Sequence, residues 1–355
     1  MKAIIASKRF NPGHISHIEA NFNLLDQQGF DVRLSLHRHF FEFMDKKFFD
    51  RRIRAGDHIK LRAGDLFIVW FPSIAVLFNA LLVRALTSAT IVYVYHEPYT
   101  SFASYRRAGF GVIKTCKITA VAIVSELLRR LSHKIILPSS RAYATLPEAR
   151  SNTDRYAKIN LLFNDEALPN HFTKQRRYIA YIGTIAEDHA FEEFVGLVSS
   201  IIRLGELSPL QFLIATRSKI PEGLVSVINY AVSTGRLVVQ AGEPMANAVI
   251  NNFYAQSYVV WNGYKRSMQS GVLPKAYMFG APVIMSIANQ SEYFKDGIHG
   301  VLISDIGDAQ EFLASIKRLR SCWEEASTNC RKFYLQNFDR NALSEKFIKF
   351  VSSKI

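Results

Sequence analysis

Residues 270–303, SGVLPKAYMFGAPVIMSIANQSEYFKDGIHGVLI, form the most specific stretch of the sequence. Their pattern predicts a short helix over 274–279, a turn at Gly280 and a strand over 282–285, followed by a polar loop and a second strand. Backbone amides that precede a helix are suited to bind a diphosphate. The spacing alone favours a simpler interpretation, an ordinary loop–helix–strand unit with Lys275 on its surface.

Short apolar runs alternate with amphipathic segments along nearly the whole chain, which indicates α/β domains with parallel sheets. A polar stretch with a proline, residues 164–174, separates two such series. We predict an N-terminal domain over 1–168, a C-terminal domain over 169–335 and a mainly helical segment over 336–355. The predicted strands cover 2–6, 31–35, 65–71, 90–95 and 135–138 in the first series, and 178–183, 210–215, 237–241, 258–261, 282–285 and 300–303 in the second.

The bulk composition is that of a globular protein, with 49% hydrophobic and 21% charged residues in a chain of 355 residues. Three cysteines without metal-ligand spacing fit a reducing compartment, and the N-terminus lacks a signal-peptide layout, so we predict a cytoplasmic location. The net charge of +14 favours an anionic partner, although a basic surface kept for solubility explains it as well. Nucleic acid is disfavoured because the cations are dispersed without a recognisable basic-aromatic module.

Two apolar stretches bear on membranes. Residues 65–86 have nearly the ~20-residue length of a membrane span, but Pro72 and Asn79 interrupt them, so we predict a strand and a buried helix. Residues 105–134 mix cationic and apolar side chains in the manner of a helix on an anionic membrane surface. A helix packed on the sheet is equally supported there, because residues 116–124 look like core. The cations of this stretch are Arg106, Arg107, Lys114, Lys117, Arg129, Arg130, His133 and Lys134.

The stretch 270–303 resembles the donor-binding region of family 4 glycosyltransferases and their GT-B relatives. Weaker resemblances occur in order along the chain, at residues 11–34, 95–98, 181–183 and 239–242. The residues that carry the main resemblance are Ser270, Gly271, Gly280, Ala281, Pro282, Val283, Ile284, Glu292, Gly297 and Gly300.

The resemblance implies two facing Rossmann-like domains, with a last helix that crosses back to the N-terminal domain. It also implies transfer of a sugar from a nucleotide-diphosphate sugar, with retention of configuration and without a metal or other cofactor. The leaving diphosphate then needs cations and helix amides. The implied catalytic residues are His96, Lys275 and Glu292. The implied donor-binding residues are Gly183, Arg217, Gly242, Glu243, Lys265, Arg266, Ser270, Gly271, Val272, Lys275 and Ser291, and Gly13 and His14 lie on the acceptor side.

The sequence departs from the family pattern at its charges. The usual pair of glutamates falls at Ser267 and Lys275, and the usual Arg and Lys after the first strand of the C-terminal domain are replaced by residues 184–189, TIAEDH. We therefore expect one of two situations: other cations hold the diphosphate, or donor binding is weak or altered. The expected acceptor is a lipid-linked glycan of bacterial surface polysaccharide synthesis. The alternatives are a soluble acceptor and a non-catalytic nucleotide- or sugar-binding protein.

Overall fold

The computed structural model describes residues 1–54, 56–96, 101–107, 109–266 and 270–353. The chain divides into two compact units. Unit 1 comprises Met1–Asp165 together with Asn337–Ile355, and unit 2 comprises Glu166–Gln336. The chain thus leaves unit 1 a few residues before the predicted boundary at 168 and re-enters it close to the predicted position at 336.

Unit 1 contains a six-stranded parallel sheet with the order β2-β1-β3-β4-β5-β6. Its central strands read as continuous apolar runs because helices cover both faces of the sheet. The strands are β1 (Lys2–Ser7), β2 (Asp31–Leu36), β3 (Leu66–Val69), β4 (Thr90–Val94), β5 (Lys134–Leu137) and β6 (Tyr156–Lys158). The three-residue strand β6 was not predicted, since a segment of that length carries almost no periodicity.

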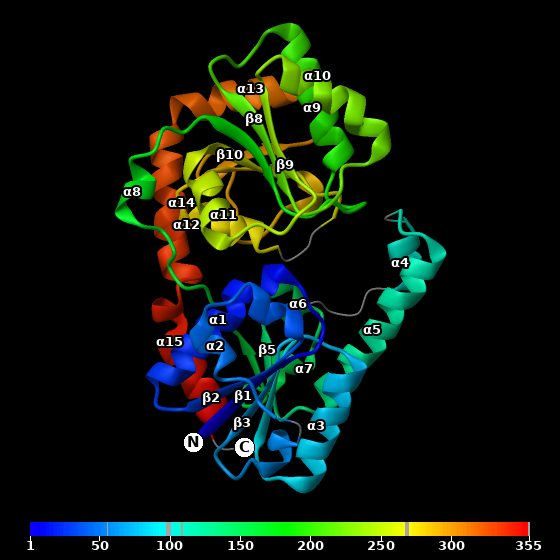
Figure 1. Ribbon diagram of the computed structural model, residues 1–355, viewed down its shortest axis with the longest axis vertical. Helices are drawn as coiled ribbons and strands as arrows, with labels where there is room; N and C mark the ends of the chain where they lie inside the picture. Colours follow the sequence, from blue (N-terminus) through cyan, green and yellow to red (C-terminus); the bar gives the residue numbers. More distant parts are fainter. Residues whose placement is uncertain (55, 97–100, 108, 267–269, 354–355) are drawn as a thin grey trace. The chain divides into compact units, whose positions relative to one another are not determined.

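The helices of unit 1 lie on both faces of this sheet (Figure 1). The terminal helix α15 packs beside α1, and its Phe347, Phe350 and Val351 are buried. Phe163 and Asp339 form a parallel bridge where the chain re-enters the unit. The helices are α1 (Ile15–Gln27), α2 (Lys46–Phe49), α3 (Ile74–Leu86), α4 (Phe102–Arg107), α5 (Val112–Leu131), α6 (Ser140–Ala144), α7 (Glu148–Ser151) and α15 (Arg340–Ser352).

One prediction about burial in unit 1 is wrong: α3 was expected to be buried, but Ile74 and Phe78 on its outer side are 77% and 60% exposed. For residues 116–124 of α5, core was one of two open alternatives, and the structure leaves Cys116 and Ile123 exposed. Composition marks both helices as apolar, and it does not tell which face of an apolar helix meets the sheet. Within the described ranges, none of the helices combines the length and apolar composition that a membrane span requires.

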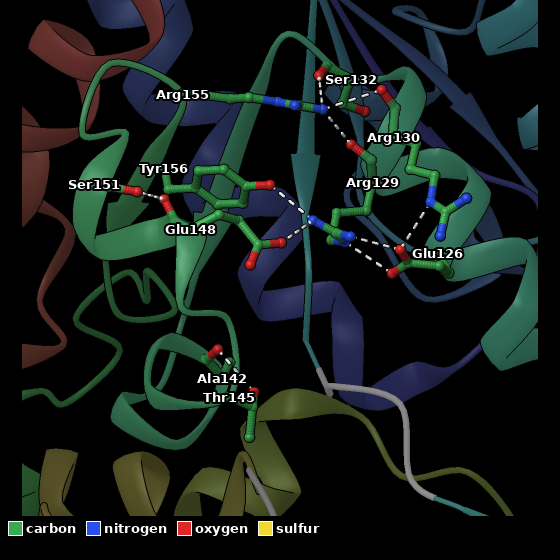
Figure 2. A network of polar contacts seen from close by, with 10 residues as sticks. All are labelled: Glu126, Arg129, Arg130, Ser132, Ala142, Thr145, Glu148, Ser151, Arg155 and Tyr156. Carbon is green, nitrogen blue, oxygen red and sulfur yellow. Dashed lines mark hydrogen bonds and ion pairs between the residues drawn. The ribbon is translucent and has the colours of Figure 1, made fainter.

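A network of polar contacts holds the C-terminal end of α5 against β6 and α7 (Figure 2). The Arg129 guanidinium contacts Glu126 at 2.5 Å, Glu148 at 2.6 Å and the Tyr156 hydroxyl at 2.8 Å. Arg155 Nη2 donates to the carbonyl oxygens of the last residues of α5, Arg129 and Arg130, at 3.0 Å each. Carbonyls at a helix end lack partners within the helix, so Arg155 satisfies them and fixes this end of α5.

Unit 2 contains a second six-stranded parallel sheet, with the order β12-β11-β10-β7-β8-β9. Gly300 in β12 has a φ of +142°, and a Cβ there would lie 2.0 Å from the Val283 carbonyl oxygen, so only glycine fits. The strands are β7 (Tyr178–Ile182), β8 (Gln211–Thr216), β9 (Leu237–Ala241), β10 (Ser257–Asn262), β11 (Val283–Ser286) and β12 (Gly300–Ile303).

The buried core of unit 2 lies between this sheet and its helices, with Phe194, Phe212 and Trp261 among its largest side chains. The helices are α8 (Pro169–Phe172), α9 (Phe191–Leu204), α10 (Val225–Ser233), α11 (Asn247–Gln256), α12 (Val272–Met278), α13 (Ala309–Ser321) and α14 (Trp323–Asn337). Each predicted strand of the chain has a counterpart whose ends lie within two residues of the predicted ones. The predicted α/β class with parallel sheets is confirmed.

Candidate functional site

The carboxyl edge of the unit 1 sheet gathers histidines and aromatic rings. The His96 ring, just after β4, stacks on the His14 ring with centroids 5.6 Å apart and planes 3° apart. The Trp70 indole, just after β3, meets His96 edge-on at 5.1 Å. His17 on α1 stacks on Trp70, with 5.8 Å between centroids. The structure thus brings together His96 and His14, which the sequence placed on the catalytic and acceptor sides.

His96 is held in one protonation state. Its Nε2 lies 2.8 Å from the Trp70 carbonyl oxygen. A carbonyl only accepts, so Nε2 carries the proton and Nδ1 is an acceptor. Burial lowers the pKa of His96 to about 4, although the hydrogen bond to Trp70 acts in the opposite direction. At neutral pH the ring is therefore uncharged and suited to accept a hydrogen bond from a sugar hydroxyl. Glu97 and Pro98, its predicted companions, lie outside the described residues.

The loop before α1 is shaped by Asn11. Its side-chain oxygen accepts a hydrogen bond from the Gly13 amide at 3.1 Å, and its side-chain nitrogen lies 3.3 Å from His14 Nε2. The amide nitrogen donates, so His14 Nε2 accepts. Among the described residues, the buried Trp70 Nε1 has no hydrogen-bond acceptor. Neither Asn11 nor Trp70 was predicted as a site residue, and Trp70 lies within the predicted strand 65–71, just after the observed end of β3.

In unit 2, the end of β7 lies against the start of α12. Gly183 has a φ of +147°, which favours glycine, and a Cβ there would lie 3.7 Å from Val272 Cγ2. The Ser270 hydroxyl accepts a hydrogen bond from the Val272 amide at 3.1 Å and contacts the Tyr264 hydroxyl at 3.3 Å. Gly271 is the N-cap of α12. Four predicted donor-site residues therefore lie together, while Ser267 lies outside the described residues.

The segment 184–189, where the resemblance led us to expect cations, folds back onto the loop after β10. The His189 ring stacks on Tyr264 at 4.6 Å with an 18° angle between planes, and its Nδ1 donates to the Thr184 carbonyl at 2.6 Å. The Asp188 side chain is 4% exposed and accepts a hydrogen bond from Arg266 Nε at 2.7 Å. This acidic segment therefore binds a cation of the protein instead of supplying one.

Each of three predicted phosphate-binding cations is paired with a carboxylate of unit 2. Lys265 Nζ lies 2.5 Å from Glu193, and Arg266 is paired with Asp188. Lys275, which is buried within α12, lies 2.7 Å from Glu166. Asn251 Nδ2 donates to the same Glu166 oxygen at 2.8 Å. Sequence analysis missed these partners because they are distant in the sequence.

Arg217 and Gly242 follow β8 and β9 at the carboxyl edge of the same sheet. Arg217 is half-buried, and burial lowers its pKa. The Gly242 amide donates to the Thr216 carbonyl at 3.2 Å, which joins the two strand ends, and the adjacent Glu243 is exposed.

Ser291 and Glu292 lie in the turn after β11. The Ser291 hydroxyl accepts a hydrogen bond from the Tyr293 amide at 3.3 Å. Glu292 is exposed, and its carboxylate, together with burial, raises the pKa of Tyr293. No helix begins at this turn, so Glu292 is not a helix N-terminal carboxylate.

Within the described ranges, no group of three or more His, Cys, Asp or Glu side chains is arranged to hold a metal ion. Metal independence remains a prediction.

Each of the two units has a six-stranded parallel sheet, and the terminal helix α15 returns to unit 1; these features match the GT-B fold. Solved structures with this fold match essentially the whole chain. HepE of Anabaena in complex with UDP-glucose matches with a TM-score of 0.72, 12% identity and full coverage of both chains. A glycosyltransferase of Rickettsia africae has a TM-score of 0.69 and 12% identity, over 99% of this chain and 97% of that one.

Sucrose-phosphate synthase of Thermosynechococcus elongatus matches with a TM-score of 0.68 and 12% identity, over 98% of this chain and 97% of that one. No protein-family model matches the sequence, and no curated protein matches it. The predicted GT-B fold is therefore confirmed by structural similarity at low sequence identity.

Proposed function

We propose that the protein is a glycosyltransferase that moves a sugar from a nucleotide-diphosphate sugar to a membrane-presented, lipid-linked glycan. The reaction retains anomeric configuration, uses no metal and serves bacterial surface polysaccharide synthesis. The fold supports the proposal because the similar structures are glycosyltransferases, and one of them holds UDP-glucose.

The observation that carries the proposal is the junction of β7 with α12. Gly183 has no side chain, so its backbone leaves room beside Val272 and the Ser270–Gly271 loop. A diphosphate at this junction meets backbone amides without a steric barrier. Arg217, from the neighbouring strand β8, adds a cation at the same sheet edge. We assign the diphosphate to these groups, and the base to Gly242 and Glu243.

The paired cations Lys265, Arg266 and Lys275 play a smaller part in this assignment. Each already faces a carboxylate, so the charge it offers to a diphosphate is largely offset. They position the loop after β10 and the helix α12. In unit 1, we assign the neutral His96 to a sugar hydroxyl, as the acceptor of a hydrogen bond, and Gly13 and His14 to the acceptor substrate. In unit 2, we assign Ser291 and Glu292 to the donor.

The first test is thermal stabilisation of the protein by nucleoside diphosphates and their sugars. A ligand at 100 times its dissociation constant adds about 2.7 kcal/mol to the folded state. We expect one nucleoside diphosphate to stabilise the protein, and we expect Arg217→Ala to weaken this effect more than stabilisation by the matching nucleoside. Lys219→Ala, an exposed neighbour, is the control. If Arg217→Ala weakens stabilisation by the nucleoside diphosphate and by the nucleoside equally, the assignment of Arg217 to the diphosphate is wrong. If no nucleotide stabilises the protein, the proposed nucleotide-sugar donor is wrong.

The pairing of all three cations favours one alternative, a protein that binds a nucleotide or sugar without catalysis. Such a protein is stabilised by the nucleotide, but it releases no nucleoside diphosphate from the nucleotide sugar when acceptors are added. Release with lipid-linked but not soluble glycans supports the proposal. Release with small soluble acceptors alone instead identifies a transferase for soluble substrates.

A further inference from the structure

The helix α5 presents apolar side chains outward. Its buried residues are Thr115, Ser125 and Leu128, and the Ser125 hydroxyl contacts the Tyr93 hydroxyl at 2.6 Å. Its outward side is an apolar stripe at helical spacing, composed of Ile113, Cys116, Ala120, Ile123 and Leu127, all exposed. Ile113 is 75% exposed. A surface helix of a water-soluble protein normally presents polar and charged side chains outward, so this apolar stripe is suited to an apolar medium.

The neighbouring helix α3 presents a second outward stripe. Its inward residues Val76, Ala80 and Val83 are buried, whereas Ile74, Phe78, Leu81 and Ala85 are exposed. The strand order places β3, β4 and β5 side by side, so two successive right-handed crossovers put α3 and α5 on one face of the sheet. The two helices also contact each other (Figure 1). We call their outward stripes together the α3–α5 face.

The charges of α3, α5 and the segment that joins them are mainly cationic. Residues 66–125 contain a single acidic residue, Glu97, against Arg84, Arg106, Arg107, Lys114 and Lys117. Arg84, Lys114 and Lys117 are exposed on the two helices, and Arg130 follows Leu127 with a 72% exposed side chain. The acid of α5, Glu126, is engaged by Arg129 and Arg130. Exposed apolar side chains bordered by cations complement the interface of an anionic bilayer.

We propose that the α3–α5 face inserts its apolar stripes into the interfacial region of an anionic lipid bilayer, with Arg84, Lys114, Lys117 and Arg130 at the lipid phosphates. A second copy of the chain fits less well, because a two-fold contact would place these cations against each other without acids to oppose them. This proposal deepens the proposed function by naming the surface that binds the membrane. It rests on the proposed function only in that the acceptor is presented by a membrane. The contacts of Arg129 and Arg155 anchor the C-terminal end of α5, at one end of this face (Figure 2).

The test is co-flotation of the full chain with vesicles of phosphatidylcholine, with and without phosphatidylglycerol, at low and high salt. We expect binding to the phosphatidylglycerol vesicles that salt weakens. Lys114→Glu with Lys117→Glu is expected to reduce binding at least about tenfold. Phe78→Ser with Ile123→Ser is expected to do the same, because it removes inserted side chains. The matched controls, Lys46→Glu with Lys47→Glu on α2 and Leu204→Ser with Tyr230→Ser in unit 2, alter exposed residues elsewhere and keep binding.

Cys116 gives a direct readout, because it is exposed on the α5 stripe while Cys330 is buried. In a Cys322→Ser background, an environment-sensitive dye on Cys116 is expected to shift to shorter wavelength when the anionic vesicles are added. The same dye on Lys47→Cys, in a Cys116→Ser and Cys322→Ser background, keeps its emission.

Equal binding to neutral and anionic vesicles, or binding that survives both double substitutions, overturns the inference. The inference is also overturned if the protein does not bind vesicles but forms a concentration-dependent dimer, and if Phe78→Ser with Ile123→Ser abolishes that dimer. Stabilisation by nucleotides, measured on the same variants, separates the two proposals. Vesicle binding without stabilisation by any nucleotide supports the membrane role of the α3–α5 face and contradicts the proposed transferase. Stabilisation by a nucleotide without vesicle binding supports the transferase and contradicts the membrane role.

Discussion

Replacement of Arg266 by methionine removes the ion-pair partner of a buried carboxylate. The Asp188 side chain is 4% exposed, and Arg266 Nε lies 2.7 Å from its Oδ2. At this distance and an effective dielectric constant of about 20, the gross attraction is about 6 kcal/mol. Loss of one partner from such a pair typically costs about 3–5 kcal/mol, because the remaining charge is left buried. His189 Nε2, 3.8 Å from Asp188, remains as a neighbour. We therefore expect a cost of about 3 kcal/mol, at the lower end of that range.

Thermal unfolding of a double-mutant cycle checks this value. For a domain of this size, 3 kcal/mol corresponds to a fall in the melting temperature of about 6–12 °C. Asp188→Asn combined with Arg266→Met removes both charges and is expected to recover most of the loss. The control is Arg318→Met, since the Arg318–Asp296 pair has a similar distance of 2.8 Å but side chains 52% and 39% exposed. An exposed pair contributes about 0–1 kcal/mol.

Additive losses from Asp188→Asn and Arg266→Met would refute the reasoning, because coupled partners do not add. The cycle also tests the site. If Arg266 is committed to Asp188, the double variant binds the nucleoside diphosphate within about threefold of the unmodified protein, a difference below about 0.7 kcal/mol. A loss of a hundredfold would show instead that Arg266 itself holds the diphosphate.

Three further predictions concern single residues. The pKa of the His96 imidazole is lowered to about 4 in the folded protein. As the pH falls below about 6.5, the imidazole is therefore protonated in the unfolded chain before it is protonated in the folded one, which destabilises the fold. Between pH 7 and 5 we expect the unmodified protein to lose more stability than His96→Gln in urea titrations. Lys134 is fully buried, and burial lowers its pKa, so its charge opposes folding below that pKa. Lys134→Met is expected to be neutral or stabilising at pH 7, with this benefit shrinking as the pH rises toward about 10.5; a large loss of stability by calorimetry would contradict it. Gly183→Ala, at a φ of +147°, is expected to cost about 1–3 kcal/mol and to weaken nucleotide stabilisation; an unchanged response to nucleotide would separate the glycine from the site.

The strands were predictable because buried parallel strands are short apolar runs bounded by turn residues. The stretch 178–183, YIAYIG, is such a run, and the structure has a strand at Tyr178–Ile182. The exposure of α3 was not predictable in the same way. Its sequence is apolar on all sides, so periodicity cannot separate the small inward residues Val76 and Ala80 from the large outward Ile74 and Phe78.

The place of the candidate residues in the fold was predictable, but the pairing of their charges was not. Gly183, Arg217 and His96 lie at the carboxyl ends of predicted strands, where ligands of such sheets bind, and their roles remain predictions. The ion pairs of Lys265 and Lys275 were not accessible, because Glu193 and Glu166 lie 72 and 109 residues away along the chain. A lysine in a sequence is counted as a cation, whereas the structure shows whether a carboxylate already offsets it.

The return of the chain to unit 1 has a consequence for the order of synthesis. Unit 2 is one continuous segment, Glu166–Gln336, whereas unit 1 is built from Met1–Asp165 and Asn337–Ile355. Synthesis therefore completes the sequence of unit 2 while unit 1 still lacks the buried Phe338 and Phe347. The N-terminal unit emerges first but finishes second, the reverse of the usual order for successive domains. During that interval the surface of α1 that α15 later covers is open to chaperones.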